Sequence, residues 1–200
     1  MSSQRAVDQP STWLRAAVLV GGFTALLWVL EVVDTAAGHR LDGYGVRPRD
    51  DEGLLGVIFA PVLHGGFAHL SANTVPVLVL GFLVLVSGIG RGLAVTAVIW
   101  VVAGLGVWLI APAQSIHLGA SSLIFGWLVY LLVRGFWSRR AGELILGLTL
   151  FFLYGGLLLG VLPGQPGISW QGHLFGAAGG LLAGMWLSER RTERLRQETW

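Results

Sequence analysis

A serine and a histidine, each surrounded by small residues, are the side chains of this sequence best suited to covalent chemistry. Ser121 lies in the run Gly119-Ala120-Ser121-Ser122 at the start of one apolar segment, and His173 lies near the start of a later one. A serine hydroxyl becomes a nucleophile when an adjacent base takes its proton, and histidine is the most frequent such base. We therefore predict a fold that brings Ser121 and His173 together.

A second polar group, in an earlier apolar segment, has the composition of an oxyanion-binding site. His69 and Asn73 are four residues apart, so on a helix they share one face. Both side chains can donate hydrogen bonds, and with a backbone N–H they suit the oxyanion that develops during acyl transfer. Losing one such donor typically costs about 2.7–4 kcal/mol of transition-state stabilisation. His64 precedes His69 by five residues, and we expect it at the entrance of the same helix.

Each of these residues also has a simpler interpretation. A serine in a membrane helix usually donates to a backbone carbonyl, and His173 could be an ordinary interhelical histidine. His64 and His69 could bind a metal, but a spacing of five is poor for one helical face and no carboxylate accompanies them, so no metal site is predicted. Gly176 and Gly180 form a small-xxx-small pair, which is typical of close helix packing. The polar groups of three separate apolar segments are expected at the same depth in the membrane, and this favours an active site over the simpler interpretations.

The composition is that of a membrane protein. Of the 200 residues, 54% are hydrophobic and 12% are charged, whereas soluble domains carry about 25% charged residues. There is no cysteine, which excludes disulfides and cysteine-based metal sites. The net charge is only +2 and no extended basic patch is present, so nucleic acid is not an expected partner.

The apolar segments predict an all-α membrane protein, a bundle of six transmembrane helices. A span needs about 20 predominantly apolar residues. The predicted spans cover approximately residues 13–33, 61–86, 93–110, 118–133, 144–162 and 170–187. The first apolar run lacks a clear signal-peptide cleavage site, so we expect it to remain as a helix. The expected organisation is a polar tail (1–12), a membrane domain (13–187) with a long first loop (34–60), and a charged tail (188–200).

The arginines predict the orientation in the membrane. Positively charged residues near the ends of spans favour the cytoplasmic side. With the N-terminus inside, ten of the thirteen basic residues lie on the cytoplasmic side, and only Arg40, Arg47 and Arg49, in the first loop, lie outside. Both tails are therefore expected in the cytoplasm, and the polar groups of the candidate site are expected toward the outer face. No acidic residue is then expected beside His173, which favours a Ser–His dyad over a triad.

The spacing of these residues resembles that of the rhomboid family of intramembrane serine proteases, over about residues 59–184. The family has the pattern H-x4-H-x3-N in one core helix, G-x-S-G at the start of a later helix, and a histidine followed by spaced small residues in the last. This sequence matches these positions with His64, His69 and Asn73, with Gly119, Ala120 and Ser121, and with His173, Gly176 and Gly180.

The resemblance implies a function and a role for each residue. Ser121 would be the nucleophile and His173 the general base. His69, Asn73 and the Ser121 backbone N–H would stabilise the oxyanion, with His64 close by. The substrates would be transmembrane proteins, cut where small residues let a helix unwind. The family needs no metal or other cofactor, and a bacterial member would be a multi-pass protein of the plasma membrane.

Three positions depart from the family pattern. Ser122 replaces the second glycine of the serine motif and adds a side chain beside the nucleophile. Phe125 stands where many members have a tyrosine that packs on the catalytic histidine, so the ring is kept and the hydroxyl is lost. Leu55 and Gly56 occupy the spacing at which many members have a Trp-Arg pair in the first loop.

Two other functions compete with proteolysis. A rhomboid-like pseudoprotease would bind membrane helices without cutting them, and loss of the serine or the histidine would indicate it; both are present. A transporter would show charges at the membrane midplane or broken helices in paired halves, and neither is evident in the sequence.

Overall fold

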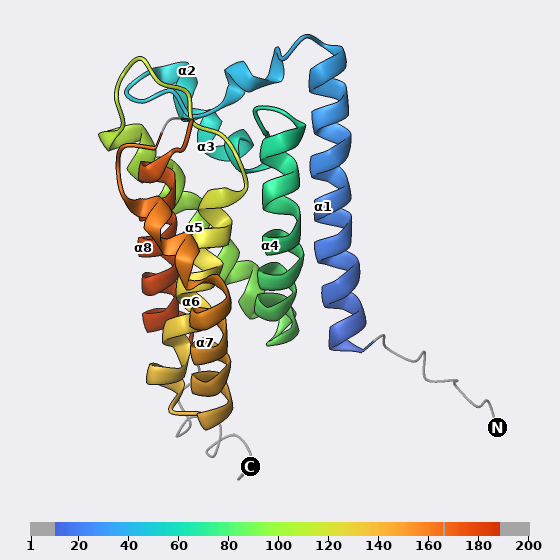
Figure 1. Ribbon diagram of the computed structural model, residues 1–200, viewed down its shortest axis with the longest axis vertical. Helices are drawn as coiled ribbons and strands as arrows, with labels where there is room; N and C mark the ends of the chain where they lie inside the picture. The colour runs from blue at the N-terminus through green and yellow to red at the C-terminus, as the bar shows by residue number, and fades with distance from the viewer. Residues whose placement is uncertain (1–10, 166, 189–200) are drawn as a thin grey trace, which may run out of the picture.

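The computed structural model describes residues 11–165 and 167–188. In this part of the chain the regular secondary structure is helical, apart from one isolated β-bridge between Val46 and His117. The predicted all-α class is confirmed. The elements, shown in Figure 1, are α1 (Thr12–Ala36), η1 (Leu41–Tyr44), α2 (Asp51–Leu54), α3 (Gly56–Phe59), η2 (Ala60–Val62), α4 (Phe67–Val86), α5 (Ile89–Ile110), α6 (Ser121–Ser138), α7 (Ala141–Tyr154), η3 (Gly155–Val161) and α8 (Trp170–Leu187). The expected tails lie almost wholly outside the described residues.

Five of the described helical segments are long and apolar enough to cross a membrane: α1, α4, α5, α6, and α7 continued by η3. The chain is therefore a multi-pass membrane protein. The predicted sixth span corresponds to α8, which is helical over 18 residues but is not among these five. Gln171, His173 and the glycines of α8 lower its mean hydropathy. The count of six spans, like the orientation in the membrane, stays a prediction.

The long helices form a bundle in which α6 is central. It packs against α4, α5, α7 and α8, whereas α1 lies at one edge and packs mainly on α4 (Figure 1). The largest side chains buried on α6 include Leu123, Leu128 and Tyr130, which are at most 1% exposed. By contrast, Phe152 and Leu153 on α7 are 76% and 71% exposed, as expected of a helix that faces lipid.

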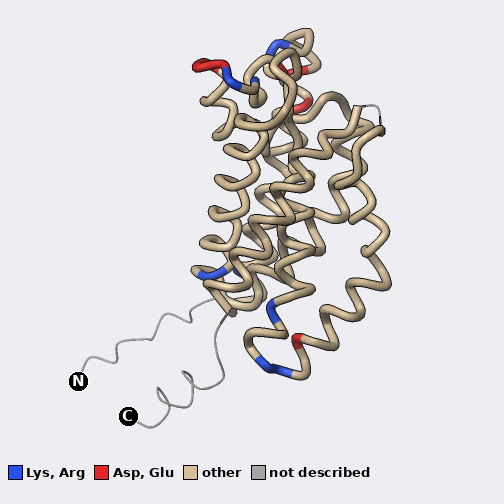
Figure 2. The backbone as a smooth tube through the Cα atoms, turned by 90° about the vertical axis from the view of Figure 1, so that its left-hand side faces the viewer, with Lys and Arg blue, Asp and Glu red and all other residues tan. Residues whose placement is uncertain are grey.

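Among the residues that the structure describes, the charged ones lie toward the two ends of the bundle (Figure 2). We call the end that carries residues 37–66, 111–120, 162–165 and 167–169 the loop end. The described helix α1 begins, and α8 finishes, at the opposite end (Figure 1). The segment 111–120 leads from the loop end down into the bundle, so that α6 begins well below that end (Figure 1).

Several predicted spans have different boundaries in the structure, and for the second and the fifth the sequence explains the difference. The second was expected to begin at residue 61, but α4 begins at Phe67, because Pro61 belongs to the 3-10 turn η2 and Gly66 has φ +112, outside the helical range. The fifth was expected to continue to residue 162, but α7 ends at Tyr154 and the chain tightens into η3. Glycines disfavour a continuous α-helix, and η3 begins with Gly155 and a second glycine.

The first loop is ordered and is fixed to α5. The indole N–H of Trp100 donates to the Val57 carbonyl at 2.7 Å, and that of Trp108 donates to the Asp50 carbonyl at 3.0 Å. The Asp50 side chain also caps α2, because it accepts hydrogen bonds from the first backbone amides of that helix. These contacts hold the loop over the loop end of the bundle.

Glycines let the backbones of α6 and α8 touch. A Cβ atom added to Gly176 would collide with the Ser122 carbonyl, and one added to Gly180 would collide with the Gly126 carbonyl. The small residues of α8 thus face the first two turns of α6. Close backbone approach of this kind is the usual basis of tight packing between membrane helices.

We expect Gly176→Ala and Gly180→Ala each to destabilise the fold by about 1–3 kcal/mol, the usual cost of overpacking. The matched control is Gly90→Ala, since Gly90 is helical and has no atom within 4 Å of the added Cβ. This control should be neutral or stabilising by roughly 0.5–1 kcal/mol. Thermal unfolding in detergent gives the midpoint temperature of each of the three variants. Equal midpoints for the three variants would contradict the proposed packing.

Candidate active site

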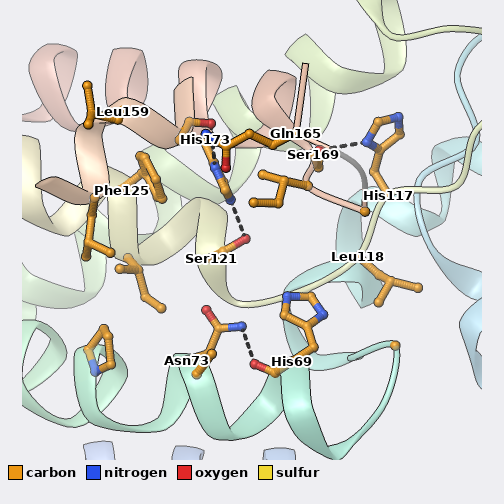
Figure 3. Close-up of a pocket in the computed structure, with 18 of the residues that line it drawn as sticks. His69, Asn73, His117, Leu118, Ser121, Phe125, Leu159, Gln165, Ser169 and His173 are labelled. Carbon is orange, nitrogen blue, oxygen red and sulfur yellow. Dashed lines mark hydrogen bonds between the residues drawn. The ribbon is translucent and has the colours of Figure 1, made fainter. Parts of the chain in front are cut away.

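Ser121 and His173 are in hydrogen-bond contact. Ser121 is the first residue of α6 and His173 is in the first turn of α8. The Ser121 Oγ lies 2.9 Å from the His173 Nε2 (Figure 3). His173 is 8% exposed, so the pair lies inside the bundle. The two residues are 52 positions apart in the sequence, and the contact between α6 and α8 brings them together.

The hydrogen bonds of His173 fix its tautomer. Its Nδ1 lies 2.9 Å from the backbone carbonyl of Gly160, in η3. A carbonyl oxygen can only accept, so in the neutral imidazole Nδ1 carries the proton and the lone pair of Nε2 faces the Ser121 hydroxyl. This is the tautomer that a general base requires. The Gly160 carbonyl therefore occupies the place that a carboxylate has in a triad.

Two neighbours hold the imidazole in position. The Phe125 ring, one turn after Ser121, stacks on the His173 ring with centroids 3.9 Å apart and an angle of 9°. A Cβ on Gly160 would lie 2.8 Å from Phe125 Cζ and 3.1 Å from His173 Nδ1. The site therefore has room for glycine alone at position 160. The sequence offered little signal for Gly160, which lies in a leucine-rich run that the prediction assigned to a regular helix.

His69 and Asn73 lie on the α4 side of Ser121, opposite to His173 (Figure 3). The Asn73 side-chain amide donates to the His69 backbone carbonyl at 3.0 Å, which uses one of its two N–H bonds. The His69 ring packs against Gly119: a Cβ there would lie 2.7 Å from His69 Cε1. Gly119 has φ +120, a conformation that favours glycine. This turn leaves space for the His69 ring beside the nucleophile.

His64 has a different position from His69. It is 2% exposed and does not line the cavity that contains Ser121. Its Nε2 accepts a hydrogen bond from the Ala120 backbone N–H at 3.3 Å. The structure therefore places His64 behind the nucleophile, where it contacts the backbone next to Ser121. Burial is the main cause that lowers the pKa of His64 to about 3, and the charge of the nearby His69 is the second cause.

The dyad opens into a cavity of about 900 Å³, which also contains His69 and Asn73. Besides α4 and α6, its walls come from η3 and from residues 116–118, 165 and 167–169. These walls add polar groups that the sequence analysis did not single out: His117, Gln165 and Ser169 (Figure 3). They make part of the cavity wall hydrophilic, as a site that must hold water requires.

His117 and Ser169 form a hydrogen-bonded pair across this wall. The Ser169 Oγ lies 2.6 Å from His117 Nδ1 and accepts from the Gly172 backbone N–H at 3.2 Å. Ser169 is thus the N-cap of α8, the helix that carries His173. A serine just before an apolar helix is a recognisable N-cap signal. Nothing comparable in the sequence indicates its partner His117.

Ser122, which replaces the second glycine of the family motif, lies outside the large cavity. It lines a separate small cavity of about 30 Å³, together with residues of α5 and α8 such as Val107 and Gly172. The departure from the motif therefore lies at a cavity that neither His69 nor Asn73 lines.

The buried His64 makes stability depend on pH. The folded state keeps His64 neutral down to about pH 3, whereas the unfolded state binds a proton below its ordinary value of 6.5. Below pH 6.5 the unfolded state therefore binds more protons, and stability falls as pH falls, by up to about 1.4 kcal/mol per pH unit. We expect thermal unfolding between pH 7.5 and 5 to show a shallower decline for His64→Asn than for the wild type. Unfolding temperatures that fall equally with pH in the wild type and in His64→Asn would contradict this role.

Relatives with similar sequences are bacterial. An uncharacterized protein of Mycobacterium tuberculosis is 47% identical over 195 residues, which cover 92% of this chain and 81% of the relative. One of Mycobacterium leprae is 45% identical and covers 92% of this chain and 77% of the relative. YdcA of Bacillus subtilis, named provisionally as a rhomboid protease, is 28% identical over 163 residues, which cover 80% of this chain and 78% of the relative.

The family model described as the Rhomboid domain matches residues 51–190. This range begins at α2 and includes Ser121, His173 and every other residue that lines the large cavity. Because the match extends over well more than half of the sequence, the chain belongs to the rhomboid family.

Proposed function

We propose that this protein is an intramembrane serine endopeptidase that cleaves transmembrane proteins through the Ser121–His173 dyad. The observation that carries the proposal is the Ser121 Oγ–His173 Nε2 contact of 2.9 Å, with Nδ1 held by the Gly160 carbonyl. This arrangement has a nucleophile, a base in the correct tautomer and a group that orients the base.

The first half-reaction forms an acyl-enzyme. His173 Nε2 takes the proton of the Ser121 hydroxyl as Oγ attacks the scissile carbonyl carbon. The resulting imidazolium keeps its hydrogen bond to Gly160 and lies against the Phe125 ring, whose face attracts a cation. It then gives the proton to the leaving amine, and the C–N bond breaks. A water molecule activated by His173 attacks the ester in the second half-reaction and frees Ser121.

The oxyanion of each tetrahedral intermediate needs donors on the side of Ser121 away from His173. In our proposal these are the Ser121 backbone N–H, the His69 ring and the free N–H of the Asn73 amide. The support is that both side chains line the cavity, with the His69 ring against Gly119. Donors fixed before reaction stabilise developing charge without reorganisation.

The substrate must present a bare peptide carbonyl to the dyad. In a helix each carbonyl is hydrogen-bonded within the chain, so a transmembrane substrate must unwind before it is cut. Small or helix-breaking residues make this easier. A cavity of about 900 Å³ with polar walls suits a short extended segment. In a bacterial cell, we place this activity in the plasma membrane.

Labelling with a fluorophosphonate, which reacts with activated serines, tests the dyad without a known substrate. We expect wild-type protein in detergent to be labelled at Ser121, and labelling to be lost in Ser121→Ala and reduced by roughly 10³-fold or more in His173→Ala. Cleavage of a panel of transmembrane substrates in liposomes should follow the same order. Folded wild type that neither reacts nor cleaves would instead be a pseudoprotease. Cleavage that survives Ser121→Ala would refute the mechanism.

For the oxyanion donors, we expect Asn73→Ala and His69→Ala each to lower kcat by roughly 10²–10³-fold with a small change in KM. The matched control is Ser71→Ala, an exposed position on α4 between the two. Steady-state cleavage in detergent gives both constants. An effect on KM alone would assign these residues to substrate binding.

A further inference from the structure

The buried face of α1 ends in two carboxylates near the loop end. Its buried residues recur every three or four positions, and the series finishes with Glu31 and Asp34. Each of these two acids is 2% exposed. A carboxylate removed from water is costly unless it is paired or coordinates a metal ion.

The hydrogen bonds of these acids are incomplete. Asp34 Oδ1 accepts from the Leu41 backbone N–H at 2.6 Å, but the buried Asp34 Oδ2 has no hydrogen-bond partner. Glu31 Oε1 has a long contact of 3.5 Å with the Thr35 hydroxyl, and the buried Glu31 Oε2 has no hydrogen-bond partner. Buried polar atoms without partners are rare in folded proteins and need an explanation.

A turn after α1 brings a histidine and a third acid to the same place. Gly38 and His39 both have positive φ, and the chain then folds back over the end of α1. His39 Nδ1 lies 3.4 Å from Asp34 Oδ2 and 3.9 Å from Asp42 Oδ2. Among the described residues, His39 is the only basic side chain paired with these acids. Two carboxylates, those of Asp34 and Asp42, therefore lie beside one imidazole.

The ligand atoms have the spacing of a metal site. Single atoms of Asp34, His39 and Asp42 all lie within 4.8 Å of one another. Bonds of about 2.0–2.2 Å in a tetrahedral zinc site place neighbouring ligands roughly 3.4 Å apart. His39 Nδ1 and Asp34 Oδ2 already have this separation, at 3.4 Å, and His39 Nδ1 and Asp42 Oδ2 are 3.9 Å apart. Glu31 lies one helical turn before Asp34 and interacts electrostatically with all three residues.

We propose that Asp34, His39 and Asp42 bind one divalent transition-metal ion, for which Zn²⁺ is the best fit. Imidazole favours zinc and its neighbours over Ca²⁺ and Mg²⁺, which prefer oxygen ligands. The ion would bind the buried Asp34 Oδ2, which has no hydrogen-bond partner, and its charge would stabilise the nearby Glu31 carboxylate. This site is separate from the Ser121–His173 dyad.

The ion would lie beside the contact between α1 and α4. The backbone amide of Gly66, the N-cap of α4, lies near the Glu31 carboxylate. One turn earlier on α1, Trp28 donates to the Thr74 hydroxyl at 3.2 Å and its ring stacks on Phe67. A metal held by Asp34 and the turn 38–42 would therefore stabilise the end of α1 where it packs on the helix that carries His69.

The test is a Zn²⁺ titration of the full-length protein in detergent after removal of metals by a chelator. We expect one ion per chain by calorimetry and by elemental analysis, and a higher unfolding temperature with Zn²⁺. His39→Ala and Asp42→Asn should each weaken binding by at least tenfold. Their side chains are 50% and 29% exposed, so neither change should prevent folding. Asp51→Asn, an exposed acid of the same loop, is the matched control.

Several results would overturn the proposal. Absence of saturable binding of Zn²⁺ or Mn²⁺ up to millimolar concentration would show that protons alone neutralise the cluster. Binding that is unchanged in His39→Ala and Asp42→Asn would place the ion at other histidines. Tighter binding of Ca²⁺ or Mg²⁺ than of Zn²⁺ would refute the assigned class of ion. None of these measurements depends on proteolytic activity.

Discussion

The contact between the backbones of α6 and α8 is the constraint on which the site depends. Ser121 and His173 have short side chains and lie on different helices, so they meet only if the helix axes approach more closely than ordinary side chains allow. Gly176 and Gly180 permit this, because any larger residue would strike a carbonyl of α6. Lipid supplies no hydrophobic force between helices, so this close packing must itself contribute to holding the dyad together.

A second constraint is that polar groups inside a bundle need partners, and here the main chain supplies most of them. The Gly160 carbonyl accepts from His173, the His69 carbonyl accepts from Asn73, and the Ala120 amide donates to His64. Main-chain partners add no further charge to an environment in which a charged side chain is expensive. The acid cluster at the end of α1 is the contrasting case, since Glu31 Oε2 lacks any partner among the described residues.

The helical class, five of the predicted apolar helices and the pairing of Ser121 with the segment of His173 could be predicted from the sequence, because apolar length and glycine spacing are local signals. The role of His64 could not be predicted from the sequence. Its spacing from His69 indicates the active site, but the turn at Gly66 separates the two residues and directs His64 to the Ala120 amide. The change from α7 to η3 was also missed, since a leucine-rich run gives the same signal in either helix type.

The orientation of His173 by the carbonyl of η3 has an evolutionary consequence. A side-chain acid can be lost by a single substitution, and its presence identifies a triad in any sequence. A main-chain carbonyl persists whatever residue is encoded, so selection at position 160 acts on size alone. In a site of this kind, main-chain atoms therefore contribute as well as side chains. A list of the side chains alone gives too few of the groups that form the site.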